Sequence, residues 1–206
     1  AGIVSLTKVG AANQTLSGAS TYSGPTTING GRITLTGSLN VGASTATTFV
    51  APGAFLSGTG VITAAVLSDS GGGTVSLTGP NQIGSVVTSG VVGGFTLNNA
   101  QSISLGSINS TAQILITTSA GSDITLAGGT VLTSSANGAA VTLAAGRNFI
   151  NNSGPGAINL TGTGYWRIYS QSPAADVFNG LDSGHTAIWN TSYPTAFAAG
   201  TNRYLF

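Results

Sequence analysis

A short motif recurs about every twenty residues over most of the chain. In it, a β-branched or aromatic residue is followed by a small polar residue, a leucine and usually a turn residue, as in Val75–Gly79. The leucines of the early copies follow one another at nearly constant intervals: Leu16, Leu35, Leu56, Leu77 and Leu97. A period of this size with short alternating strands is typical of a chain wound into a solenoid. The repeat therefore predicts a β-solenoid of about 20 residues per coil.

The residue types favour strands and turns over helices. Thr, Ser, Gly, Asn, Val and Ile are abundant among the 206 residues, and Lys, Arg, Asp and Glu together number only nine. The abundant types either disfavour helices or favour strands and turns. Gly, Ser, Thr or Asn also interrupts every apolar run before it reaches the ~18 residues of a membrane helix. The chain is therefore predicted to be all-β, without stable membrane insertion of this segment.

The expected architecture is a single-stranded, right-handed parallel β-helix. Each coil should supply three short strands, with aliphatic residues stacked inside at a spacing of about 4.8 Å and Thr or Ser outside. Right-handed winding follows from the strong preference of parallel crossovers for that hand. Gly pairs and Asn-Gly steps should turn the corners. An irregular coil or an extra loop is expected between Leu97 and Leu126, where Leu105 and the segment 114–116 compete for one role.

The composition changes near residue 163, which predicts two regions. Residues 1–163 form the repeat array, in which the long stretch 33–146 contains only Asp69 and Asp123 as charged residues. Residues 164–206 hold both Trp, most of the Tyr and the only His. This second region is predicted to be a C-terminal cap or a junction segment.

Six aromatic residues of the C-terminal region form a candidate site with more than one interpretation. The last coil of a solenoid exposes an open core and an unpaired strand edge, which a hydrophobic cap would cover. The same rings could instead stack against a sugar ligand or meet a following domain. A cap is the preferred interpretation, and the residues are Tyr165, Trp166, Tyr169, Trp189, Tyr193 and Tyr204.

Few residues of this chain are suited to catalysis. Paired-carboxylate glycoside cleavage needs two acids roughly 5–9.5 Å apart, but Asp69 and Asp123 are far apart in the sequence and each is expected to cap its own turn. Asp182, Ser183 and His185 lie too close in sequence for a nucleophilic relay, and no Gly-x-Ser-x-Gly elbow accompanies them. The chain is therefore predicted not to be an enzyme.

Charge and cysteine content restrict the partners further. A net charge of +1, with dispersed arginines, provides no field that would attract nucleic acid. The chain has no Cys, which excludes disulfides and thiolate metal sites, and no cofactor or metal is expected. The segment Ala1–Val4 lacks the basic and apolar regions of a signal peptide, which is therefore expected to be absent or removed.

Two stretches resemble exported bacterial proteins. Residues 6–35 resemble the autotransporter-associated β-strand repeat, through the segments 6–10, 15–18, 22–31 and 33–35. The tail is similar to the segment that ends β-helical arrays in filamentous-haemagglutinin-like exoproteins, through the segments 164–173, 187–190 and 200–206. The resemblance implies a passenger or exoprotein of a Gram-negative bacterium, either secreted or held at the outer cell surface. Such proteins act as adhesins, biofilm components or stalks.

The preferred function is a non-enzymatic, extracellular structural or adhesive module. Its expected partners are host or abiotic surfaces, glycans, or other copies of the chain through the ends of the β-helix. One alternative is a self-assembling fibre subunit, in which an uncapped N-terminal coil beginning at Ile3–Leu6 adds to another chain's strand edge. A glycan-binding or glycan-active β-helix is the other alternative.

Overall fold

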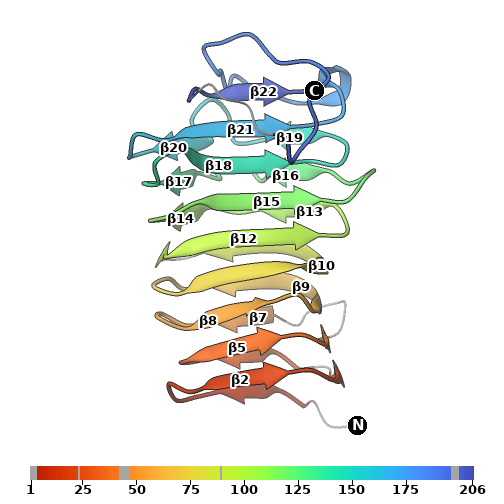
Figure 1. Ribbon diagram of the computed structural model, residues 1–206, viewed down its shortest axis with the longest axis vertical. Helices are drawn as coiled ribbons and strands as arrows, with labels where there is room; N and C mark the ends of the chain where they lie inside the picture. The colour runs from red at the N-terminus through yellow and green to blue at the C-terminus, as the bar shows by residue number, and fades with distance from the viewer. Residues whose placement is uncertain (1–3, 23, 42–46, 89, 196–199) are drawn as a thin grey trace.

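The computed structural model describes residues 4–22, 24–41, 47–88, 90–195 and 200–206. It is an elongated stack of coils with the two chain termini at opposite ends (Figure 1). Every strand pairing in the described part is parallel, and near the N-terminus Leu6 pairs with Thr26, one coil further along the chain. The only helical element described is a 3-10 turn, η1 (Pro173–Ala175). The prediction of an all-β parallel solenoid is therefore confirmed, while its right-handed winding stays a prediction.

One face of the solenoid is a continuous parallel sheet that runs from the first coil to the last. Each strand of this front face pairs with its counterpart in the next coil, and the strands between the first and the last pair on both sides (Figure 1). Its strands are β2 (Asn13–Leu16), β5 (Arg32–Leu35), β8 (Phe55–Gly58), the beginning of β10 (Thr74–Thr88), β12 (Gly94–Asn99), β15 (Ile114–Thr118), β18 (Ala139–Ala144), β21 (Tyr165–Tyr169) and β22 (Arg203–Leu205).

The remaining strands form a rear face and, in the later coils, a side face. The long strand β9 pairs with two shorter strands of the coil below it, β6 and β7. The rear face contains β1 (Leu6–Lys8), β3 (Ala19–Thr21), β4 (Thr26–Ile28), β6 (Ser38–Asn40), β7 (Thr47–Val50), β9 (Val61–Asp69), the end of β10, β13 (Ile103–Leu105), β16 (Ile124–Leu126) and β19 (Phe149–Asn151). The side face is a separate sheet made of β11 (Val91–Val92), β14 (Ile108–Ser110), β17 (Leu132–Ser134) and β20 (Ile158–Leu160).

Columns of apolar side chains inside the coils form the core. Successive side chains of a strand point to opposite faces, so the aliphatic residues of each alternating strand point inward. In the front face, one inward column rises through residues that pair in register and are at most 1% exposed: Leu77, Leu97, Ile116, Leu143 and Ile168. The alternation of apolar and hydroxyl residues in the sequence thus becomes a continuous hydrophobic stack.

The register differs from the spacing of the motif leucines in the third coil. Leu56 pairs with Ile33 below and Val75 above, whereas Leu35 faces Gly58. The third copy of the motif is therefore displaced by two residues relative to its neighbours. Because side chains alternate with a period of two, this displacement keeps Leu56 on the core side.

A column of glycines turns the corner after the front face in the early coils. A Cβ atom on Gly60 would lie 2.1 Å from the carbonyl oxygen of Gly37, and one on Gly79 would lie 2.2 Å from that of Gly60. A Cβ on Gly37 would meet the Gly18 oxygen at 2.2 Å. The close approach of successive coils explains why several copies of the leucine motif end in glycine.

Buried asparagines replace glycine at this corner in the later coils. Asn81 and Asn99 pair in register and are fully buried. The Asn99 side chain accepts a hydrogen bond from the Ile83 N–H (2.9 Å) and donates to the carbonyl oxygens of Ile83 and Gln101 (2.9 Å each). The Oδ1 atom of Asn81 accepts from the Ile62 N–H in the same way (2.8 Å). Because buried backbone groups need partners, these side chains join one coil to the next.

The coils lengthen toward the C-terminus. Phe95 pairs with Ile114 and Ile114 pairs with Val141, so the second of these coils contains several more residues than the first. Leu105 and Ile116 do not compete, because they lie on the rear and front faces respectively. The coil from Phe95 to Ile114 is therefore regular, and the extra residues begin in the turn 119–123, within the interval 97–126 where an extra loop is expected.

Candidate functional site

The C-terminal segment after β21 folds over the last full coil (Figure 1). Trp166 and Tyr204 occupy the tops of two inward columns, where they pair with Val141 and Ile168 of the coils below. Both residues are buried, and their rings meet edge to face at 5.0 Å. Phe178 packs against Tyr204 with ring centroids 4.5 Å apart. These rings close the hydrophobic core of the shaft, so the C-terminal aromatic cluster forms a cap.

Tyr204 also has a polar contact within the cap. Its hydroxyl donates to the Leu181 carbonyl oxygen at 2.7 Å. Burial raises the pKa of the Tyr204 phenol well above its ordinary value, and the carboxylates of Asp182 and Asp176 raise it further. The phenol therefore stays neutral and fixes the 178–182 turn to the end of the core.

The other four predicted aromatic residues, Tyr165, Tyr169, Trp189 and Tyr193, lie apart from these two columns. The rings of Tyr169 and Tyr193 meet edge to face at 5.6 Å, and the Tyr169 hydroxyl donates to the Thr195 carbonyl oxygen at 3.1 Å. The Tyr165 ring lies under the Arg167 guanidinium at 4.7 Å. The contacts of Tyr169 attach the 190–195 segment to the outer side of the front face.

An open hollow of about 460 Å³ lies on the outer side of the cap. Its largest exposed side chain is Trp189, which is 62% exposed and packs against Phe206 with ring centroids 5.2 Å apart. Phe206 in turn stacks nearly parallel to Tyr204 (interplanar angle 5°, 6.4 Å). The lining residues are Pro173, Phe178, Gly180, Leu181, Asp182, Ser183, His185, Ala187, Trp189, Tyr204 and Phe206.

The polar rim of this hollow is made by Asp182, Ser183 and His185. One carboxylate oxygen of Asp182 accepts from the Gly184 N–H (2.9 Å). The Ser183 hydroxyl donates to the His185 carbonyl oxygen (2.7 Å), and the His185 Nδ1 atom lies 2.8 Å from the Ser183 carbonyl oxygen. Since the hydroxyl is bonded to a carbonyl and not to the imidazole, the three residues do not form a serine nucleophile with its base.

Asp69 and Asp123 do not form a pair of accessible carboxyl groups. Asp69 is fully buried in β9, where one carboxyl oxygen accepts from the Gly71 N–H (2.8 Å) and the other has no partner. Burial raises the pKa of Asp69 above its ordinary value. The expected turn contact is thus present at Asp69, but this carboxyl group cannot reach a substrate.

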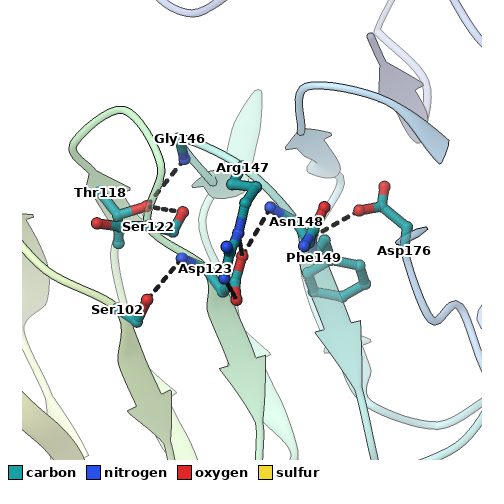
Figure 2. A network of polar contacts seen from close by, with 9 residues as sticks. All are labelled: Ser102, Thr118, Ser122, Asp123, Gly146, Arg147, Asn148, Phe149 and Asp176. Carbon is teal, nitrogen blue, oxygen red and sulfur yellow. Dashed lines mark hydrogen bonds and ion pairs between the residues drawn. The ribbon is translucent and has the colours of Figure 1, made fainter. Parts of the chain in front are cut away.

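Asp123 differs from the expectation that it caps its own turn. Its carboxylate accepts two hydrogen bonds from the Arg147 guanidinium, at 2.8 and 2.6 Å, and one from the Asn148 N–H at 3.0 Å (Figure 2). The hydrogen bonds from Arg147 lower the pKa of Asp123. Asp176, two coils above Asp123, also accepts from a backbone N–H of a neighbouring coil, that of Phe149 in the coil below it, at 2.8 Å (Figure 2). Both carboxyl groups therefore connect neighbouring coils.

The described part of the chain contains no group of three or more His, Cys, Asp or Glu side chains that could hold a metal ion. Within the same ranges, no helix is long and apolar enough to cross a membrane.

The site also contains residues that sequence reasoning did not find. Phe178 and Phe206 connect the predicted aromatic residues, and the only available signal was their apolar character within a polar tail. The convergence of His185 and Asp182 with Trp189 depends on the path of the cap segment, which no spacing in the sequence indicates.

Comparison with known proteins gives one match. Residues 6–36, which span β1 to β5, match the passenger-associated transport repeat. No curated protein and no solved structure matches the chain. The parallel β-solenoid and the repeat together fit a β-helical fragment of an autotransporter passenger. The resemblance of residues 6–35 is thereby confirmed, while the likeness of the tail to haemagglutinin-like exoproteins stays a prediction.

Proposed function

We propose that this chain is a non-catalytic, extracellular module of a Gram-negative surface protein, acting as a rigid spacer and as an adhesive surface. The match of residues 6–36 to a passenger repeat supports export to the cell surface. The hydroxyl-rich outer side of the coils suits contact with surfaces or glycans, because short hydroxyl groups can both donate and accept hydrogen bonds.

The observation that carries this proposal is the unbroken front face. Nine strands, from β2 to β22, pair in sequence without a gap. Eight steps of about 4.8 Å correspond to a shaft of roughly 38 Å. Each step is held by backbone hydrogen bonds and by the inward apolar columns, so the module should behave as a stiff rod and not as a flexible tether.

The fibre-subunit alternative requires strand edges that can pair with another copy at both ends of the β-helix. At the N-terminal end, β1, β2 and β3 each pair only with a strand of the next coil; Ile3, named in that alternative, lies outside the described residues. At the C-terminal end, an isolated bridge between Ile188 and Leu205 covers the last strand. Head-to-tail growth needs two open ends. Within the described residues, the bridge at Ile188 leaves β22 less open to such pairing than β1 to β3.

The glycan-active alternative lacks support in the described part of the chain. Of the two array acids, Asp69 is buried and Asp123 is bound to Arg147, so neither is free to act as a general acid or base. Asp69→Asn and Asp123→Asn variants should therefore leave any interaction with glycans unchanged.

Two measurements test the proposed function. Electron microscopy of the purified protein should show short discrete rods, and beads coated with the protein should adhere to cells or abiotic surfaces more than beads coated with albumin. Long filaments would favour the fibre subunit. Adhesion equal to that of the albumin beads would remove the adhesive role.

A further inference from the structure

The hollow in the cap contains an exposed aromatic ring that cap formation alone does not require. Trp166, Tyr204 and Phe178 already close the core, whereas Trp189 is 62% exposed. Phe206 holds the indole in place, at a centroid separation of 5.2 Å. A large, positioned and exposed indole offers a flat apolar platform to a ligand.

Polar groups beside this platform are held in fixed positions. The Gly184 N–H occupies one oxygen of Asp182, and the second oxygen has no hydrogen bond within the described part of the chain. The Nδ1 atom of His185 is fixed by the Ser183 carbonyl oxygen, which leaves Nε2 available. Asp182, which has an oxygen left to accept, and His185, which has a free imidazole nitrogen, therefore line the same hollow as the exposed indole.

We propose that this hollow binds a neutral saccharide, with one sugar ring stacked on Trp189 and its hydroxyl groups bonded to Asp182 and His185. A pyranose ring has an apolar C–H face and a polar edge of hydroxyl groups, which matches an aromatic platform beside an acceptor and an imidazole. The hollow measures about 460 Å³, within the ~300–1,000 Å³ range of small-ligand sites. The inference rests on the proposed adhesive function and names its ligand class.

The charges around the hollow favour neutral over acidic sugars. Asp182 lies in the lining, and its carboxylate and that of Asp176 both act on the Tyr204 phenol, whose pKa they raise further than burial alone does. Among the described residues that line the hollow, none is Lys or Arg. Uronic, sialic or sulfated sugars would bring a further negative charge to this place, where neither Lys nor Arg among the described lining residues balances it.

The test uses the purified chain, an array of neutral, sialylated, sulfated and uronate-containing oligosaccharides, and a set of variants. Neutral oligosaccharides should bind and acidic ones should not. Trp189→Ala should weaken binding by about fivefold or more, Trp189→Phe should restore part of it, and Asp182→Asn should weaken it. Tyr193→Ala removes an exposed ring outside the hollow and is the matched control, which should bind like the parent.

Several results would overturn the inference: no neutral oligosaccharide bound, acidic ones bound equally well, or less than about fivefold weakening in Trp189→Ala. Because Trp189 is exposed, thermal unfolding of this variant should match that of the parent, which separates lost binding from lost folding. The bead assay separates the two proposals. Absence of adhesion in the parent contradicts the adhesive function, whereas adhesion of the parent without binding to any neutral oligosaccharide contradicts the saccharide site alone.

Discussion

At several buried positions, a side-chain amide makes the hydrogen bonds between coils that backbone groups make elsewhere in the solenoid. Asn81 and Asn99 are fully buried at the corner where the glycine column ends, and their amide groups satisfy backbone groups of neighbouring coils. Asn151 does the same near the cap, donating to the carbonyl oxygens of Gly154 and Phe178 (2.8 Å each). Such buried amides stabilise a fold only when all their partners are present.

Replacing Asn99 by alanine should therefore be costly. The change leaves the N–H and C=O groups of Ile83 without their buried partners, which should lower the free energy of unfolding by about 2–4 kcal/mol. Urea denaturation followed by circular dichroism measures this loss. Gln82→Ala, an exposed amide in the same corner, is the matched control and should have little effect. Equal effects of the two changes would contradict the role of the buried amide.

Asp69 should make stability depend on pH. Burial raises its pKa above the ordinary value of 3.8, so the native state holds this proton more tightly than the unfolded chain. At a pH below 3.8, Asp69 is protonated in both the native and the unfolded state, so no carboxylate has to be buried. The cost of burying the carboxylate grows as the pH rises through the native pKa. An asparagine in place of Asp69 would keep an oxygen that accepts from the Gly71 N–H, but it could not ionise.

The Asp69→Asn variant should accordingly gain stability relative to the parent as the pH rises from about 3 to about 7. Urea midpoints of the two proteins across this range measure the difference. A difference that stays constant, or that shrinks as the pH rises, would show that the raised pKa of Asp69 has no effect on folding.

At the scale of the strand and the turn, the glycine column sets how closely successive coils approach. Gly60→Ala would place a methyl group 2.1 Å from a backbone oxygen of the coil below, and the loss should be at least about 2 kcal/mol. Gly128→Ala is the matched control, since its Cβ would have only one neighbour, at 3.9 Å. Thermal unfolding of both variants tests this, and a Gly60→Ala protein as stable as Gly128→Ala would contradict the packing of the column.

The strands themselves could be predicted from the sequence, because apolar alternation and the nearly constant repeat both depend on local pattern. The register of the third coil could not. There Gly58 takes the place of a leucine, and Gly60 continues the glycine column, so the motif is displaced by two residues. A shift of two keeps every side chain on its own side of the sheet, and the pattern alone cannot detect it.

Only part of the aromatic site, likewise, could be predicted from the sequence. The concentration of Trp and Tyr after residue 163 indicated a cluster at the end of the shaft, and the structure places one there. Which rings close the core and which stay exposed depends on pairing with the coils below. Trp166 and Tyr204 fall on inward columns, whereas Trp189 lies in a segment that no repeat specifies.

The first and last coils of the described residues differ in how far they are covered. The first strands, β1 to β3, are largely exposed and pair on one side only, whereas the last coil is covered by the C-terminal segment and its rings. In the described part of the chain, β1 to β3 thus leave one edge without a strand partner, while β22 has a bridge to Ile188 on that side. The hollow proposed to bind a saccharide lies in the covering C-terminal segment.

The most direct test of the central claim is the network of nuclear Overhauser contacts in the shaft. The account predicts that amide protons of Leu97 show cross-peaks to α protons of residues near Leu77 and Ile116, in the pattern of parallel strands about one coil apart. Close contacts between α protons of facing strands, which are typical of antiparallel sheets, or no contact between these three residues, would contradict the solenoid and every inference that depends on it.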